Sequence, residues 1–293
     1  MESFAFAAPR TVEQALAILA EHKRDGRRAQ ILAGGTDLLV QLRGVDRTPR
    51  TLIDIKKIAE TNRLEVGPRE VFVGAAIPGV ELTASKPLAE CFPGLVEAID
   101  LIGSSQIQGR ATLGGNLCNA SPAGDTIAAL VANAGVCVIA GGGGTREQPV
   151  ESFVVGVGKN ALQPGEFLIG VKFARPAPRT ADAYLRFIPR TEMDIAVAGA
   201  GVSVTLDAGG TCTAARVAIS AVAPTVIAVP AAAQALIGTQ LDDAALAAAG
   251  AACSAASSPI TDKRGTADYR RRVVAVLCRR ATQIAQTRAK EKH

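Results

Sequence analysis

The sequence predicts an α+β protein in two parts, and three observations carry this prediction. Strand-like and helix-like segments alternate through residues 11–140, as in mixed α/β structure. The stretch RPAPR at 175–179 then combines two prolines with flanking charges, which is typical of a domain boundary. Beyond it, three strand-like segments are followed by alanine-rich helices, an order that favours a separate second domain. The 293 residues are enough for two domains with cores of their own.

A first helix is predicted from Thr11, because T-V-E-Q has the form of a capping box with Gln14 and apolar residues then recur at helical spacing. A short strand next runs straight into Gly34 and Gly35, after which helical spacing resumes. Strand, glycine turn and helix in this order let backbone N–H groups converge on an anion. The predicted elements are a helix from 11 to about 26, a strand over 29–32, a helix over 38–44 and a strand over 52–55.

The pattern then changes to a strand, a turn and a strand, with Gly67 and Pro68 suited to a tight reversal. The four glycines from Gly141 to Gly144 could form a phosphate loop. They lack the Gly-Lys-Ser/Thr ending of such a loop and lie between two strands, so a hairpin turn is predicted instead. The predicted elements are strands over 63–66 and 71–76, helices over 77–84 and 95–102, a helix after Asp125, a strand over 136–140, and short strands and turns over 153–175.

Beyond the boundary, D-A-G-G at 207–210 predicts a hairpin between the second and third strands. The predicted elements are strands over 183–187, 196–206 and 215–221, helices over 231–237 and 242–256, and a basic helix from about Asp268. The apolar face of this last helix is assigned to Val273, Val274, Leu277 and Cys278, and the opposite face to Arg270, Arg271, Arg272, Arg279 and Arg280. These arginines form either a solvated face or a docking surface for a partner chain.

Composition argues against several classes of function. The six cysteines include no C-x-x-C pair, so no iron–sulfur or zinc site is expected in this chain. With only His22 and His293 available, a Ser-His-Asp mechanism has little base to work with, and a bound cofactor is expected to carry any chemistry. Aromatic residues make up 3% and tryptophan is absent, which argues against nucleic-acid binding. No apolar run is long enough for a membrane span and no signal peptide is recognisable, so a cytoplasmic location is predicted.

A second glycine pair, Gly114 and Gly115, lies in the stretch ATLGGNLCNASPAGDT at 111–126. Because glycine has no Cβ, the backbone can approach phosphate oxygens closely and adopt positive φ. Neither pair belongs to a G-x-G-x-x-G motif, and a single Gly-Gly pair is more often an ordinary turn. Two such turns, each flanked by threonine and leading to Asp or Asn, predict one cradle for the diphosphate of a dinucleotide.

These stretches resemble a known family. AGGTDLL at 33–39 and ATLGGNLCNASPAGD at 111–125 resemble the two FAD-binding loops of molybdenum hydroxylase flavoprotein subunits, the medium chains of the xanthine dehydrogenase and carbon monoxide dehydrogenase type. RFIPRTEMDIAVAGAGV at 186–202 and PITDKRGTADYRRRV at 259–273 resemble the C-terminal domain of the same family. The resemblance extends over nearly the whole chain, and its most specific part is the second loop.

The resemblance implies a fold and a domain division. Residues 1–176 would form the two-subdomain FAD-binding fold of the vanillyl-alcohol oxidase (PCMH) type, split near residue 56. Residues 180–288 would form a small C-terminal domain of the carbon monoxide dehydrogenase flavoprotein type, with a three-stranded antiparallel sheet and helices.

The resemblance also implies a role in electron transfer. Electrons would leave molybdopterin in a large partner subunit, cross 2Fe–2S clusters in a small one, and pass through FAD in this chain to an external acceptor. The complex is expected to be a dimer of heterotrimers. The cysteine-bearing insertion that some relatives use for a 4Fe–4S cluster is absent, so no metal is expected in this chain.

Carried over position by position, the two loops would hold the diphosphate between them, with the Thr36 hydroxyl as a donor. Asp125 would reach a hydroxyl of the cofactor or cap the helix that follows, and Arg186 would lie beside the cofactor or on an exposed edge strand. Asp37 departs from some relatives, and Cys118 is interpreted as a packing residue. Ile102 and Leu168 would form apolar walls or belong to the core. The implied site is Leu32, Ala33, Gly34, Gly35, Thr36, Asp37, Leu38, Ile102, Ala111, Thr112, Gly114, Gly115, Asn116, Asn119, Asp125, Leu168 and Arg186.

Two other functions stay open at this point. A stand-alone FAD-dependent oxidoreductase of the same superfamily would act directly on a small substrate, using Asp, Glu or Ser beside the flavin. A non-catalytic scaffold would use its glycines only as turns.

Overall fold

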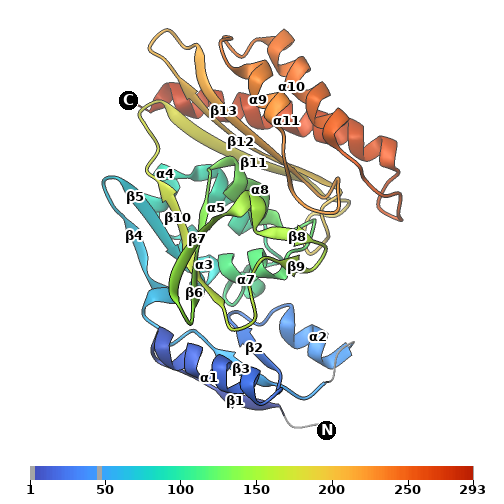
Figure 1. The fold of residues 1–293 in the computed structure, drawn as a ribbon. Helices are drawn as coiled ribbons and strands as arrows, with labels where there is room; N and C mark the ends of the chain where they lie inside the picture. The colour runs from blue at the N-terminus through green and yellow to red at the C-terminus, as the bar shows by residue number, and fades with distance from the viewer. Residues whose placement is uncertain (1–3, 45–47, 293) are drawn as a thin grey trace.

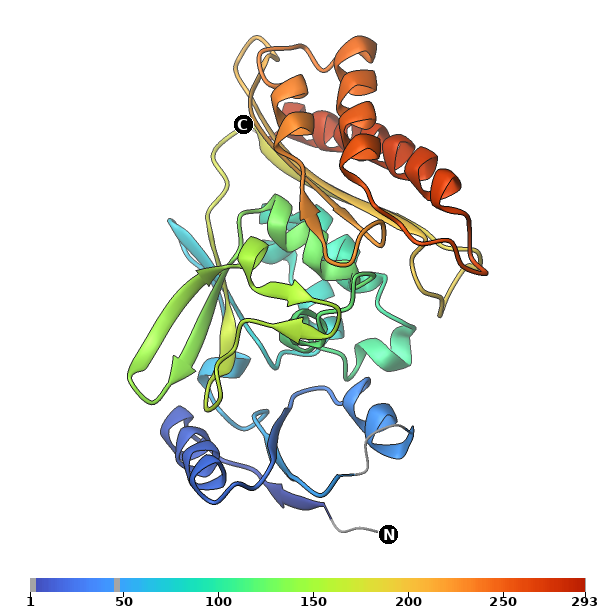
Figure 2. The same cartoon turned by 45° about the vertical axis from the view of Figure 1, so that its right-hand side comes forward.

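The computed structural model describes residues 4–44 and 48–292, which form three successive layers (Figure 1). A small sheet lies at the N-terminal end, a five-stranded sheet with short helices lies in the middle, and a four-stranded sheet with three helices lies at the other end. The same order is seen from a second side in Figure 2. His293 lies outside the described residues. His22 is buried, and its ring nitrogens lie 2.9 Å from the Ile18 carbonyl oxygen and 2.7 Å from Thr51 Oγ1.

The N-terminal layer is a parallel sheet with the strand order β1-β3-β2. Parallel strands need a crossover connection, which α1 supplies between β1 and β2. The predicted cap of α1 is confirmed, because Thr11 Oγ1 accepts the Gln14 N–H at 3.2 Å. All these elements except β1 were predicted to within a few residues: β1 (Ala5–Ala7), α1 (Val12–Arg24), β2 (Ala29–Leu32), α2 (Leu38–Gly44) and β3 (Thr51–Asp54).

The middle layer contains an antiparallel sheet with the strand order β4-β5-β10-β6-β7. Gly141 pairs with Gly144 at the β6–β7 turn, so the predicted hairpin is confirmed. Short strands and turns were predicted over 153–175, but the central strand β10 spans eight of these residues. A strand covered on both faces shows a continuous apolar run without alternation, which hid its length. The strands are β4 (Leu64–Val66), β5 (Glu70–Gly74), β6 (Val136–Gly141), β7 (Gly144–Pro149) and β10 (Phe167–Ala174).

Short helices pack on this sheet, and α8 is buried along its whole length. α8 lies between the middle layer and the C-terminal sheet, in contact with β11, β12 and β13, which explains why it is apolar on every side. The other elements here are η1 (Glu60–Asn62), α3 (Gly79–Thr83), α4 (Lys86–Cys91), α5 (Pro93–Asp100), α6 (Ser105–Gln108), α7 (Leu113–Asn119), α8 (Asp125–Ala132), η2 (Val150–Ser152), β8 (Val154–Gly156) and β9 (Lys159–Asn160).

The C-terminal layer is an antiparallel sheet with the strand order β11-β12-β13-β14. The three predicted strands and the hairpin at 207–210 are present, and the two-residue β14 adds a fourth strand that was not predicted. Helices α9 to α11 cover one face of this sheet (Figure 1). The elements are β11 (Thr180–Phe187), β12 (Ala198–Leu206), β13 (Cys212–Ser220), β14 (Ile227–Ala228), α9 (Pro230–Leu236), α10 (Asp243–Ala256) and α11 (Ala267–Glu291).

One assignment on α11 was wrong, because Arg270 does not lie on the solvated face. Its side chain is 4% exposed and its guanidinium lies 2.7 Å from a carboxylate oxygen of Asp262. It also donates to the carbonyl oxygens of Val197 at 2.8 Å and Ala221 at 3.2 Å. A buried arginine is stable only when its donors are paired in this way.

Buried polar contacts join the C-terminal layer to the middle layer. The Asp182 carboxylate in β11 accepts the N–H groups of Gly94 at 2.9 Å and Leu95 at 3.0 Å, at the start of α5, and the Asn133 amide at 2.7 Å. Arg288 near the end of α11 pairs with Glu97 of α5. The described helices include none that is long and apolar enough to cross a membrane.

Candidate functional site

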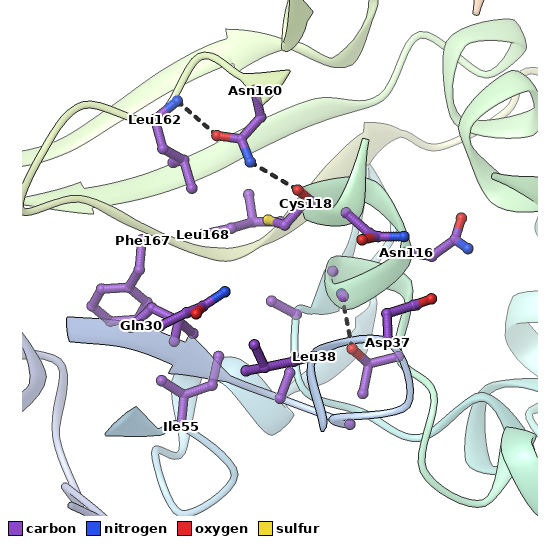
Figure 3. A pocket seen from close by; sticks show the side chains of 18 of the residues that line it. Gln30, Asp37, Leu38, Ile55, Asn116, Cys118, Asn160, Leu162, Phe167 and Leu168 are labelled. Atoms are coloured by element: carbon purple, nitrogen blue, oxygen red, sulfur yellow. Dashed lines mark hydrogen bonds between the residues drawn. The ribbon is translucent and has the colours of Figure 1, made fainter. Parts of the chain in front are cut away.

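A cavity of about 620 Å³ lies between the N-terminal layer and the middle layer. Three segments that are distant in sequence form most of its wall: 29–41, 102–119 and 158–168. Figure 3 shows Phe167 and Ile55, with Gln30 beside them, toward one end and Asp37 and Asn116 toward the other, so the first end is mainly apolar and the second is polar.

The first glycine turn leaves β2 and leads into α2. A methyl group at Gly34 would overlap the carbonyl oxygen of Arg110, so the two turns are in contact here. Gly35 has φ +82°, a conformation that residues with a Cβ rarely adopt. Among the described residues, the N–H groups of 34–37 have no hydrogen-bond acceptor. Consecutive free N–H groups in such a turn form a concave site for an anion.

The second glycine turn begins α7, and Thr112 caps this helix by accepting the Gly115 N–H at 2.9 Å. A Cβ at Gly114 would lie 2.6 Å from the Ala75 carbonyl oxygen in the middle layer. The Gly114 N–H belongs to the first turn of the helix and has no acceptor within the described chain. It adds a donor to those of the first glycine turn.

The segment 158–168 forms the third wall, and the sequence analysis missed it except for Leu168. Asn160 fastens it to α7 by donating to the Cys118 carbonyl oxygen at 2.9 Å (Figure 3). Glu166 fixes the following turn through its ion pair with Arg146 at 2.7 Å. The available signal was Gly158 and Gly165, which both have positive φ, but nothing in the sequence links them to the glycine pairs.

A side-chain hydrogen bond also joins two walls of the cavity, the one from α2 and the one from α7. Gln41 Nε2 in α2 donates to Asn119 Oδ1 in α7 at 3.2 Å, and both residues line the wall. The helices that follow the two glycine turns are therefore joined directly. The Asn116 side chain is used within the fold, because its Oδ1 accepts the Thr126 hydroxyl at 2.8 Å.

The donors and the shape of the cavity fit a dinucleotide cofactor. Two side-chain-free turns supply unpaired N–H groups for a diphosphate, and the apolar end offers contact for an aromatic ring. Within the described residues, no group of three or more His, Cys, Asp or Glu side chains could hold a metal ion.

Comparison with known proteins shows to which family of cofactor-binding proteins the chain belongs. Residues 2–176 match the family described as FAD binding domain in molybdopterin dehydrogenase, and residues 183–285 match the CO dehydrogenase flavoprotein C-terminal domain. The chain belongs to this family of FAD-binding subunits.

Individual relatives of this FAD-binding subunit agree with the family match. The carbon monoxide dehydrogenase medium chain of Afipia carboxidovorans is 32% identical over 98% of both chains. The nicotinate dehydrogenase FAD-subunit of Eubacterium barkeri is 32% identical over 73% of this chain and 72% of its own. A solved structure, the reconstituted CO dehydrogenase from Oligotropha carboxidovorans, has a chain with a TM-score of 0.92 and 31% identity over 98% of both chains. The predicted family, fold and FAD cofactor are confirmed.

The FAD-binding subunit brings fourteen of the seventeen implied site residues to the wall of the cavity. Leu32, Asp125 and Arg186 do not line it. Leu32 is buried with Leu42 and Leu52 beneath the first turn. The fourteen are Ala33, Gly34, Gly35, Thr36, Asp37, Leu38, Ile102, Ala111, Thr112, Gly114, Gly115, Asn116, Asn119 and Leu168.

Asp125 and Arg186 instead pair with each other between α8 and β11. Arg186 Nη1 lies 2.8 Å from the Asp125 carboxylate, and the Tyr184 hydroxyl is 3.4 Å from the same group. Burial raises the pKa of Asp125 to about 6, although Arg186 opposes the shift. Gly124, and not Asp125, is the residue that precedes α8. Arg186 is on an edge strand as considered, but its side chain is buried.

Burial also raises the pKa of two titratable side chains of the cavity wall, Cys118 and Asp37. Burial raises the pKa of the Cys118 thiol to about 12, so this thiol carries its proton at neutral pH and is not a nucleophile. Partial burial also raises the pKa of Asp37.

Proposed function

We propose that this chain is the FAD-carrying electron-transfer subunit of a multi-subunit molybdenum hydroxylase. One observation carries the proposal: two turns with unpaired N–H groups meet in one cavity, in a chain that matches a carbon monoxide dehydrogenase medium chain from end to end. Bound FAD supplies the redox chemistry, taking up electrons from 2Fe–2S clusters and releasing them to an external acceptor.

The roles of the chain's own residues follow from their positions. The N–H groups of Gly34, Gly35 and Thr36 and that of Gly114 hold the diphosphate from two sides. The apolar end, with Ile55 and Phe167, excludes water from a ring of the cofactor. Asp125 and Arg186 lie outside the cavity wall, where their ion pair joins α8 to β11.

The proposed assembly contains a large molybdopterin subunit and a small 2Fe–2S subunit, arranged as a dimer of heterotrimers in the cytoplasm. The absence of C-x-x-C pairs from this chain supports placing the clusters in a partner. We assign residues 1–176 to the FAD-binding domain, with its subdomains divided near 56, and 180–288 to the C-terminal domain. Residues 175–179, between β10 and β11, connect the middle layer to the C-terminal layer and support this division.

The cavity offers little to a stand-alone enzyme. Two acidic side chains of the described residues line the cavity. Glu166 forms an ion pair with Arg146, so Asp37 is left as a single candidate for a general base. The wall therefore favours a subunit that relays electrons over one that acts on a substrate of its own.

The test is purification from the native source under gentle conditions. We expect a yellow complex with one flavin per copy of this chain, together with molybdenum, iron and two further polypeptides. The isolated chain should bind FAD but show no turnover with an organic substrate. A colourless protein, or one that turns over an organic substrate without any partner, would contradict the proposal.

A further inference from the structure

The outward face of α11 is a feature that the electron-transfer role does not explain. Three of the six arginines on this helix pair with carboxylates: Arg270 with Asp262, Arg271 with Asp268, and Arg288 with Glu97. The other three form no ion pair with any of the residues the structure describes: Arg272, Arg279 and Arg280. The sequence from Tyr269 to Lys290 contains no acidic residue that could neutralise them.

The three unpaired arginines belong to one face of the helix, which we call the α11 basic face: Arg272, Val276, Arg279, Arg280 and Gln283. Arg272, Val276, Arg279 and Gln283 follow one another at spacings of four, three and four residues, which places them along one face, and Arg280 lies at its edge. Val276 at the centre is 43% exposed, and it lines a shallow hollow of about 240 Å³ with Arg279, Arg280 and Gln283. The face therefore combines an apolar centre with a cationic rim.

The fold does not require this face. α11 packs against β11, β12 and α10 through the buried residues Val274, Leu277 and Cys278 on its other side. The aliphatic part of Arg279 lies against Gly250 of α10, which holds its guanidinium in place at the surface. Neighbouring unpaired cations repel one another, so the cluster costs stability unless something outside the chain neutralises it.

The chemistry of the face indicates the kind of ligand. Guanidinium groups match carboxylates in geometry and are weakly hydrated, which makes arginine the residue of interfaces more than of solvated faces. The exposed valine would be buried by a protein surface but gains nothing from a free anion. The aromatic side chain next to this face, Tyr269, lies two turns before Val276 and packs edge-on against Phe187, with ring centroids 6.1 Å apart, so it offers a nucleic-acid base little surface for stacking.

We propose that the α11 basic face docks an acidic surface of another subunit of the complex, with carboxylates on the arginines and an apolar side chain over Val276. The proposal rests on the subunit assembly proposed above. Helix α11 lies on the C-terminal layer (Figures 1 and 2), whereas the residues that line the cavity belong to the N-terminal and middle layers. The contact therefore serves assembly and not the binding of FAD.

The first test is charge reversal in the complete complex, purified with its partner chains. The triple variant Arg272→Glu, Arg279→Glu, Arg280→Glu should weaken retention of the partner by about tenfold or more, and salt should weaken the unaltered complex in the same direction. The matched control, Lys57→Glu, Arg69→Glu, Lys86→Glu, changes the net charge equally at exposed cations on other elements. Both variants should keep their flavin content.

The second test identifies the contact itself. The variants Arg279→Lys and Arg280→Lys place a primary amine where the guanidinium was, because a carbodiimide couples amines to carboxylates. Treatment with this zero-length reagent should then link the α11 basic face to Asp or Glu side chains of a partner chain. Anionic vesicles and single-stranded DNA should bind the unaltered chain and the triple variant alike. Equal partner retention in the reversed and control variants overturns the docking proposal alone, as does binding of vesicles or DNA that the reversal abolishes. If the unaltered chain holds no partner, the proposed assembly falls with it.

Discussion

Two glycine turns face the same cavity, but their glycines have different reasons to be there. In the first turn, Gly34 touches the Arg110 carbonyl oxygen and Gly35 needs positive φ, so the fold itself excludes a side chain at both positions. In the second turn the same holds for Gly114, which abuts Ala75. A Cβ at Gly115, in contrast, would meet only Thr112 Oγ1 at 2.9 Å. Packing thus requires three of the glycines, whereas at Gly115 a side chain would meet little of the protein itself.

The threonines and aspartates of the two turns differ in a similar way. Thr112 caps α7, whereas the Thr36 hydroxyl has no hydrogen-bond partner in the part of the chain that the structure describes. Asp37 lines the cavity, whereas Asp125 is buried against Arg186. The first turn therefore presents its polar groups to the cavity, and the second uses most of them to hold itself together.

The largest effect is expected from Gly34→Ala. Its methyl group would overlap backbone of the other turn, so the free energy of unfolding should fall by about 3 kcal/mol. Urea denaturation of the FAD-free protein measures this. The control is Gly44→Ala at the end of α2, where the added methyl group meets open space and the change should stay within about 1 kcal/mol. Equal stability of the two variants would show that the turns do not pack as described.

Gly115→Val should separate binding from folding. The branched side chain displaces little besides the Thr112 hydroxyl, so the FAD-free protein should lose less stability than Gly34→Ala does, while the flavin content falls by about tenfold or more. The flavin-to-protein absorbance ratio reports the loss. Gly143→Val, at the β6–β7 turn where a side chain meets open space, is the matched control and should stay fully loaded. Full retention of flavin in Gly115→Val would count against the role given to the second turn.

Asp125 should make stability depend on pH in an unusual direction. Its pKa is about 6 in the folded protein and is expected near the model-peptide value of 3.9 when unfolded, so the folded state binds the proton more tightly. The stability contributed by its protonated form is complete below about pH 4 and is lost as the pH rises through about 6. Asp125→Asn should abolish this loss in the variant, so the difference in stability between the variant and the unaltered protein should change by about 3 kcal/mol between about pH 4 and pH 7. Asp100→Asn, at an exposed position at the end of α5, is the control; a pH-independent difference for Asp125→Asn would refute the assignment.

The smallest effects should distinguish the two threonines. Thr112→Val removes the cap of α7 and should cost about 1 kcal/mol of stability. Thr36→Val removes no contact within the described chain, so stability should change by less than about 0.5 kcal/mol, while FAD binding weakens by about fivefold through the loss of one hydrogen bond. Urea denaturation and a flavin titration together give both numbers. The contrast fails if Thr36→Val destabilises the FAD-free protein as much as Thr112→Val.

Local patterns predicted the parts of this protein that local forces determine. The cap at Thr11, the glycine turns and the β12–β13 hairpin each depend on a few adjacent residues, and each was recognisable in the sequence. The wall at 158–168 was not, because only the pairing of β10 between β5 and β6 carries it to the cavity. No adjacent residues encode that pairing.

The misassigned Arg270 shows that a charge can mislead a periodicity argument. Position 270 is in helical register with the buried residues Val274, Leu277 and Ala281, which indicates the inner face. The charge alone suggested the solvent. Arg270 is nevertheless buried because its guanidinium pairs with Asp262, a residue of a loop that helical periodicity cannot reveal.

α11 follows every other element in the chain, and this order has a consequence for biosynthesis. The apolar face of the C-terminal sheet, with Val202 and Val204 of β12, is covered by α9 to α11. Until α11 leaves the ribosome, that face is only partly covered, and the tie from Arg288 to Glu97 cannot form. Translation thus completes both glycine turns well before α11, the helix that covers the C-terminal sheet. During that interval the apolar face of this sheet is partly exposed, and exposed apolar surface on a nascent chain is prone to aggregation.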